Sequence, residues 1–178
     1  MNASGGRREQ WAANNPGGEP AYGTPEQILD LIRAAPEGTF DSLLMASGWN
    51  LLYHDGLCVL EECQARGIRV HNAGTFATGL LAGGFTFVYA EAPEEMVEAT
   101  QRWRELCDSY SLPLPAVAMA FSHMPACVDR VVVGCSSVSD VEDCVGHCER
   151  LQEEGGVPAA LWREAQAAGL LPASLTLP

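Results

Sequence analysis

The fold class is decided by residues Val131-Val132-Val133-Gly134-Cys135-Ser136-Ser137-Val138-Ser139-Asp140, where a strand-like run passes directly into a helix start. The valines predict a short buried strand over 131–134. The hydroxyl and acidic side chains that follow are typical of a helix N-terminus, and this helix is expected to run through Cys148. A strand joined to a helix by a short polar turn is the repeating unit of α/β proteins.

Two further strands are predicted upstream, over residues 40–47 and 68–73, and they are separated by a helix over 56–66 that ends at Gly67. Other helices are predicted over residues 25–35, 93–110, 113–123 and 158–168. We expect a glycine-bracketed loop over 74–81 and an irregular aromatic stretch over 83–92. The spacing in helix 93–110 predicts inward-facing side chains at Met96, Val97, Thr100, Trp103, Leu106 and Cys107.

Length and charge exclude several classes of protein. With 178 residues and three strands, the chain cannot close an eight-stranded α/β barrel, which typically needs about 250 residues. The formal charge is −13, so we expect no nucleic-acid partner.

All ten basic residues are arginines, which excludes Schiff-base and P-loop lysines. No apolar run predicts a signal peptide or a membrane span, so a cytoplasmic protein is expected, with a disordered leader over residues 1–22.

Cysteine and histidine spacing gives no metal-site or nucleophile pattern. The odd number of cysteines, seven, favours reduced thiols over a disulfide framework. Cys144 and Cys148 could be combined with Cys135 as metal ligands, but the spacing favours core or partly exposed thiols, and no metal site is predicted. His54 and His71 lack a neighbouring acid at catalytic spacing, and His123 lies in an apolar predicted helix, so all three are interpreted as structural.

The candidate site consists of the two segments that follow the last two predicted strands. Ligands of parallel α/β sheets bind beyond the carboxyl ends of the strands. Both segments offer backbone N–H groups and hydroxyls for an anion, and the second also leads into a helix N-terminus. The alternative is that these residues only build tight turns between strand and helix. The candidate residues are Gly74, Thr75, Phe76 and Thr78 in the first segment and Gly134, Cys135 and Ser136 in the second.

Five separated motifs resemble, in order and spacing, the C-terminal half of aldo-keto reductases. The greatest similarity is to the group of L-galactose dehydrogenase and D-threo-aldose (L-fucose) dehydrogenase. The motifs are Phe40-Asp41-Ser42-Leu43-Leu44, Trp49-Asn50-Leu51-Leu52, Gly67-Ile68-Arg69-Val70, Thr78-Gly79-Leu80-Leu81-Ala82-Gly83, and the run from Val131 to Asp143.

This resemblance implies a partial (β/α)₈ TIM barrel over residues 23–178, retaining about the last three strands and their helices. It implies an NAD(P)-dependent dehydrogenase of sugars or aldehydes, with L-galactose-like or L-fucose-like substrates. Loop 74–78 would hold the pyrophosphate, and the segment from Gly134 through Asp140 to Asp143 would hold the adenosine end. Asp140 stands where NADP-preferring members carry arginine, so NAD is the expected preference.

The sequence differs from the family at the catalytic residues and at several residues that contact the cofactor. The family's tetrad of Asp, Tyr, Lys and His comes from the first half of the barrel, and a chain without lysine cannot supply it, so no catalytic residue is assigned. Ala73 replaces the aromatic residue that stacks on nicotinamide, and Ala46 lies near the position of the glutamine that binds the carboxamide. Thr75 replaces a proline and Cys144 an adenine-contacting asparagine.

Two hypotheses follow from the resemblance and from the predicted open sheet. In the first, the chain is a truncated aldo-keto reductase that lacks the tetrad, is inactive alone and requires the other half of the barrel from a second chain or from a longer transcript. In the second, it is a non-catalytic remnant or interaction module that self-associates through its exposed sheet.

Overall fold

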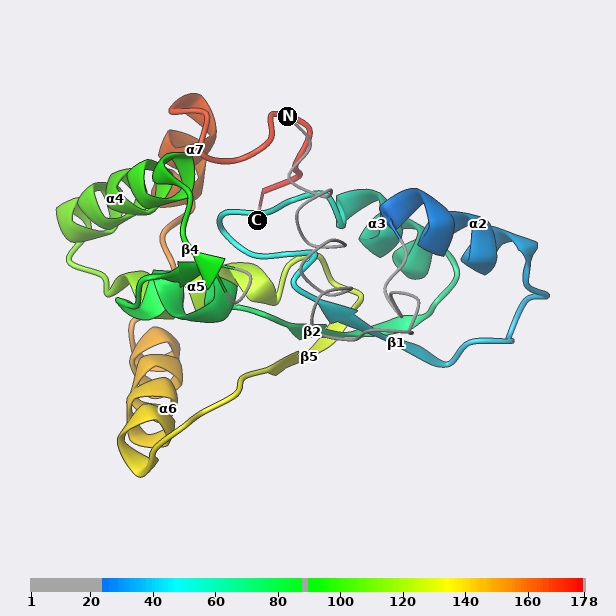
Figure 1. The fold of residues 1–178 in the computed structure, drawn as a ribbon, viewed down its shortest axis with the longest axis horizontal. Helices are drawn as coiled ribbons and strands as arrows, with labels where there is room; N and C mark the ends of the chain where they lie inside the picture. Colours follow the sequence, from blue (N-terminus) through cyan, green and yellow to red (C-terminus); the bar gives the residue numbers. More distant parts are fainter. Residues whose placement is uncertain (1–23, 88–89, 178) are drawn as a thin grey trace.

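The computed structural model describes residues 24–87 and 90–177, so the expected leader over 1–22 lies outside the described residues. Its centre is a parallel sheet with the order β1-β2-β5, in which β1 is Ser42–Ala46, β2 is Arg69–Ala73 and β5 is Val128–Val132 (Figure 1). Helices alternate with these strands along the chain. The predicted α/β class with a parallel sheet is confirmed.

The third strand lies earlier in the sequence than predicted. It ends at Val132, whose register partner is Ala73, the last residue of β2. Val133 and Gly134 therefore extend beyond the last paired position, and the predicted strand over 131–134 is wrong by about three residues at its start. The prediction of full burial is also wrong, because Val132 is 45% exposed.

The helices agree with the sequence pattern because their caps are encoded locally. Thr24 forms a reciprocal capping box with Gln27 at the start of the first described helix, and Gly67 has a positive φ of 68° just after α3, as expected for a residue that ends a helix. One helix, α6, continues five residues past the predicted Cys148. The described helices are α2 Pro25–Ala34, α3 Leu57–Ala65, α4 Glu94–Ser109, α5 Leu114–Ser122, α6 Val138–Glu153 and α7 Ala159–Ala167.

Two short elements occupy the segments that were expected to be irregular. A 3₁₀ segment, η1, covers Ala77–Ala82, and a small antiparallel pair joins β3 (Thr86–Phe87) to β4 (Ala90–Glu91). The Thr86 hydroxyl donates to the Thr78 carbonyl at 2.6 Å, which ties η1 to β3. Strands of two residues are too short to show an alternating pattern, so sequence periodicity could not predict them.

The hydrophobic core lies on the helix-covered face of the sheet. Trp49 stacks on Phe121 with ring centroids 4.7 Å apart, and the indole N–H of Trp103 donates to the Leu51 carbonyl at 3.1 Å. Most of the inward set predicted for helix 93–110 is confirmed. Val97 was predicted inward but is 48% exposed, because only part of that face of α4 meets a described neighbour.

The opposite face of the sheet has no described helix on it (Figure 1). Leu44, His71 and Arg130 are register neighbours across this face, and Leu44 is 63% exposed. Parallel sheets are ordinarily covered on both faces, so the exposure of this one is unusual. No helix in the described part of the chain combines the length and apolar character needed to cross a bilayer.

Candidate functional site

The two candidate segments leave the sheet side by side. Ala73 and Val132 are register partners at the carboxyl ends of two parallel strands. The β2–η1 loop begins at Gly74, and the β5–α6 loop begins at Val133. The structure therefore places the first residues of both segments at one edge of the sheet, as the topology predicts.

The β2–η1 loop starts at a position that requires glycine. Gly74 has φ +95°, and a Cβ atom there would lie 2.9 Å from the backbone N and Cα of Ser47. The Ser47 N–H donates to the Ala73 carbonyl at 2.8 Å, and the Asn50 side chain donates to the Gly74 carbonyl at 3.1 Å. These contacts fix the start of the loop against the segment that follows β1.

The other candidate side chains of this loop are largely turned into the protein. Thr75 is buried, and its hydroxyl has no hydrogen-bond partner among the described residues. Phe76 is partly buried against the core. Thr78 has a left-handed backbone with φ 56°, and its hydroxyl donates to the Ala77 carbonyl at 2.7 Å. Any ligand of this loop would therefore meet mainly its backbone.

The β5–α6 loop is organised around the carboxylate of Asp140. Its Oδ2 atom accepts from the Ser136 N–H at 2.8 Å, the Ser136 hydroxyl at 2.7 Å and the Ser137 N–H at 3.1 Å. Its Oδ1 atom accepts from the Ser137 hydroxyl at 2.8 Å. The hydrogen bonds from the hydroxyls of Ser136 and Ser137, with those from the backbone, lower the pKa of Asp140 to about 2, so this carboxylate is an anion at neutral pH.

The predicted anion site at the N-terminus of α6 is already filled by the carboxylate of Asp140. The donors predicted to meet a ligand already serve a carboxylate of the same chain, so a second anion would compete with Asp140 and be repelled by it. Gly134 and Cys135 remain exposed beside these contacts, and a Cβ atom at Gly134 would meet nothing within 4 Å. Asp143 is exposed on α6, three residues beyond Asp140. Ligand binding by all of these residues stays a prediction.

The structure places an acidic side chain beside His71. Its Nε2 atom lies 3.7 Å from the Asp129 carboxylate, which also lies 3.5 Å from the Arg130 Nε atom. The acid comes from the neighbouring strand, so local spacing could not reveal it. Among the described residues, no group of three or more His, Cys, Asp or Glu side chains is placed to hold a metal ion.

Asn72 and His54 are polar side chains whose environment the sequence did not reveal. Asn72 is fully buried in β2, and its side-chain N–H₂ donates to the carbonyls of Trp49 at 3.1 Å and Ser122 at 3.0 Å. The Nε2 atom of His54 is inaccessible to solvent and has no hydrogen-bond partner in the described part of the chain. Burial lowers the pKa of His54 to about 4, so the side chain is neutral at pH 7. Neither residue carries a local motif.

Comparison of this chain with known proteins shows its family. The model of the aldo/keto reductase family matches residues 26–155, which include all three parallel strands and both candidate loops. A pyridoxal 4-dehydrogenase from Microbacterium luteolum is 29% identical over 179 residues, covering 96% of this chain and 50% of that protein. A D-threo-aldose 1-dehydrogenase from Pseudomonas sp is 30% identical over 159 residues, covering 85% of this chain and 47% of that protein. The chain thus spans about half the length of these curated relatives, and it belongs to the aldo/keto reductase family.

Proposed function

We propose that this chain forms the cofactor-binding side of an NAD(P)-dependent aldo-keto reductase that oxidises or reduces a small sugar or aldehyde. The observation that carries the proposal is the pairing of Ala73 with Val132, which brings both candidate loops to one edge of a sheet matched by the family model. A nicotinamide dinucleotide, when bound there, would supply hydride transfer. The names of the two relatives, an aldose dehydrogenase and a pyridoxal dehydrogenase, support a small polar alcohol or aldehyde as substrate.

The residues of the site fit a dinucleotide that lacks a 2′-phosphate. Backbone N–H groups of the β2–η1 loop would meet the pyrophosphate, since its side chains are largely turned inward. Asp140 can accept a hydrogen bond from a ribose hydroxyl, whereas a phosphate would face its negative charge. We therefore propose NAD as the preferred cofactor.

We expect no catalysis by this chain alone. The family's proton donor is a tyrosine whose pKa is lowered by a lysine, and this chain contains no lysine. The uncovered sheet face further suggests a partial barrel, because the remaining strands of a barrel would cover Leu44 and Val132. We propose that a complementary half-barrel supplies both the strands and the proton donor.

Calorimetric titration of the full chain with NAD and NADP tests the cofactor assignment. We expect saturable binding of NAD and weaker binding of NADP. The variant Asp140→Arg should reverse this order, whereas Glu149→Gln, an exposed change on the same helix, should leave it unchanged. Tighter binding of NADP by the unmodified chain would refute the role of Asp140, and failure of both cofactors to bind would refute the proposed site.

The exposed sheet face favours a second candidate, a non-catalytic interaction module that pairs with another copy of itself. Size-exclusion chromatography and an assay with L-galactose, L-fucose and D-arabinose separate the candidates. Self-association without cofactor binding would support the module. Cofactor-dependent turnover that is lost on mutating a residue of this chain would overturn the claim that the chain is inactive alone.

A further inference from the structure

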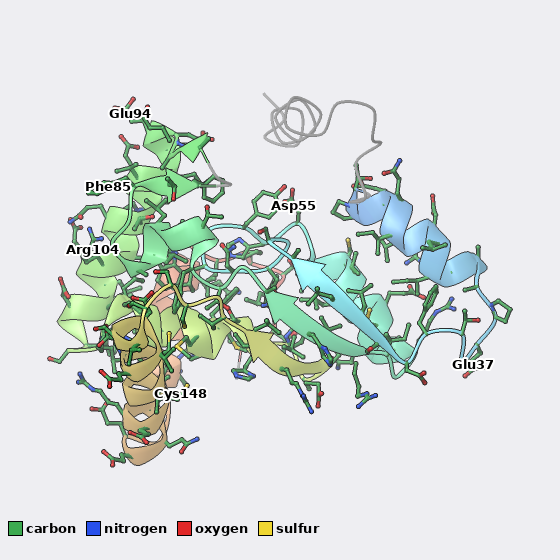
Figure 2. All side chains as sticks on the ribbon, turned by 60° about the horizontal axis from the view of Figure 1, so that its bottom comes forward. Glu37, Asp55, Phe85, Glu94, Arg104 and Cys148 are labelled. Carbon is green, nitrogen blue, oxygen red and sulfur yellow. The ribbon has the colours of Figure 1, made fainter. Side chains whose placement is uncertain are left out.

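Three cysteines lie close together in sequence around the β5–α6 junction. Cys135 is exposed in the loop, and Cys144 and Cys148 lie one turn apart on α6, the latter labelled in Figure 2. Residues four apart on a helix are neighbours on one face, so these two thiols share a face of α6. The proposed function uses Cys135 only as part of a loop and gives no role to the other two.

The loop is held back against the helix that follows it. Asp140 accepts hydrogen bonds from the backbone N–H groups of both Ser136 and Ser137, so the two residues that follow Cys135 are fixed to the first turn of α6. The Cys135 thiol is a neighbour of the Cys144 thiol and one of the groups that raise its pKa. The hydrogen bonds of Asp140 therefore hold the loop that carries Cys135 at the end of the helix that carries Cys144.

The two thiols differ in chemical character. Partial burial, with the neighbouring Cys135 thiol, raises the pKa of Cys144 to about 11, and Cys148 and Asp140 add to this effect. Cys135 is the more exposed of these two thiols, so the first reaction with an oxidant falls to it. Among the described cysteines, Cys58 is also exposed, but its thiol contacts a backbone carbonyl, that of Asp55, at 3.6 Å.

We propose that Cys135 and Cys144 are a dithiol site that hydrogen peroxide oxidises to a disulfide. The Cys135 sulfur attacks one peroxide oxygen, the O–O bond breaks, and a sulfenic acid forms with release of one water. The Cys144 sulfur then attacks the Cys135 sulfur, the S–OH bond breaks, and a second water leaves with the Cys144 proton. Overall, two thiols lose two hydrogen atoms and the peroxide is reduced to two molecules of water.

A disulfide here would act on the loop that the proposed function assigns to the cofactor. It would link Cys135 covalently to the second turn of α6, so the loop could no longer move away from the helix. We expect dinucleotide affinity to fall at least tenfold on oxidation, and this consequence rests on the proposed function. The thiol chemistry does not depend on it.

Peptide mapping of the full chain tests the dithiol site directly. Since the chain has no lysine, trypsin cuts it only after arginine, and one peptide from Val131 to Arg150 carries all three cysteines. After treatment with hydrogen peroxide and alkylation, this peptide should lack the mass of two hydrogen atoms and carry one alkyl group, on Cys148. Cleavage after Glu142 should leave its two halves joined, since only a bond from Cys135 connects them.

Matched variants complete the test. Cys148→Ser should keep the disulfide, Cys144→Ser should leave Cys135 to oxidise to a sulfinic acid, and Cys58 should remain alkylated throughout. A bond between Cys144 and Cys148, a bond between two chains, or equal oxidation of Cys58 would overturn the proposal. NAD titrations of the reduced and oxidised chain are read separately. A mapped disulfide with no NAD binding in either state would refute the proposed function and leave the dithiol site standing.

Discussion

Acidification from pH 7 to pH 5 should destabilise this protein through His54. The His54 ring packs edge-on against Trp49 at 5.8 Å and Phe121 at 5.6 Å between centroids. Its Nε2 atom is inaccessible to solvent, and no residue in ranges 24–87 and 90–177 provides it with a hydrogen-bond partner. Burial lowers the pKa of His54 from 6.5 to about 4, although the nearby Asp55 carboxylate opposes this. The unfolded chain therefore binds a proton at a pH where the folded chain does not.

The sign and size of the effect follow from these two values. Because the folded-state pKa is the lower one, the stabilisation is fully present above pH 6.5 and is lost as the pH falls towards 4. At about 1.4 kcal/mol for each pH unit, the full loss amounts to roughly 3 kcal/mol. About 2 kcal/mol of it should appear between pH 7 and pH 5.

Urea unfolding at half-unit steps between pH 7 and pH 5 measures this loss. Between pH 7 and pH 5 the carboxylates of Glu62 and Asp140 stay ionised, because hydrogen bonds hold the pKa of each below its usual value. Their contributions to the free energy of unfolding are therefore lost only at lower pH. The variant His54→Gln should be less stable at pH 7 but should lose the pH slope. His71→Gln, at a histidine whose side chain is 33% exposed, should keep it. A wild-type change below about 1 kcal/mol, or an unchanged slope in His54→Gln, would refute the reasoning.

Two pairs of variants test local packing, each by urea unfolding. Gly74→Ala should cost about 2 kcal/mol or more, because φ is +95° and the new methyl group would lie 2.9 Å from Ser47 backbone atoms, while Gly134→Ala should be nearly neutral in open space. Trp103→Phe should cost about 2 kcal/mol more than Trp49→Phe, because both indoles are fully buried but only Trp103 donates a hydrogen bond to a buried carbonyl. Equal losses within either pair would contradict these assignments.

The helices and the order of the elements could be predicted because their signals are local. Thr24 and Ser137 each form a capping box with the residue three positions later, and such a box needs no tertiary partner. Likewise, Gly67 ends α3 through its own backbone freedom. The family resemblance rests on motifs that follow one another along the chain in the same order as in the family. It is confirmed by the match of the family model over residues 26–155.

The errors concern features that depend on residues distant in sequence. The end of β5 is set by its partner Ala73, and the contact of His71 with Asp129 is set by the register of two strands. Val97 has the right spacing for an inward residue, but its exposure depends on what packs against α4. Sequence periodicity predicts a face of a helix or strand, whereas the neighbour that covers it is decided by the tertiary fold.

The uncovered sheet face also constrains what could cover it. A helix placed there would bury Leu44 and Val132 but would leave the outer backbone groups of β1 and β5 unpaired at the two edges of the described sheet. Added parallel strands would satisfy both edges and bring the face into the interior of a closed sheet. No residue of α6 is buried, and its Val141 and Val145 are 48% and 49% exposed. A covering element that contains both strands and helices accounts for all three exposed features, which is why we expect a complementary half-barrel instead of a single docked helix.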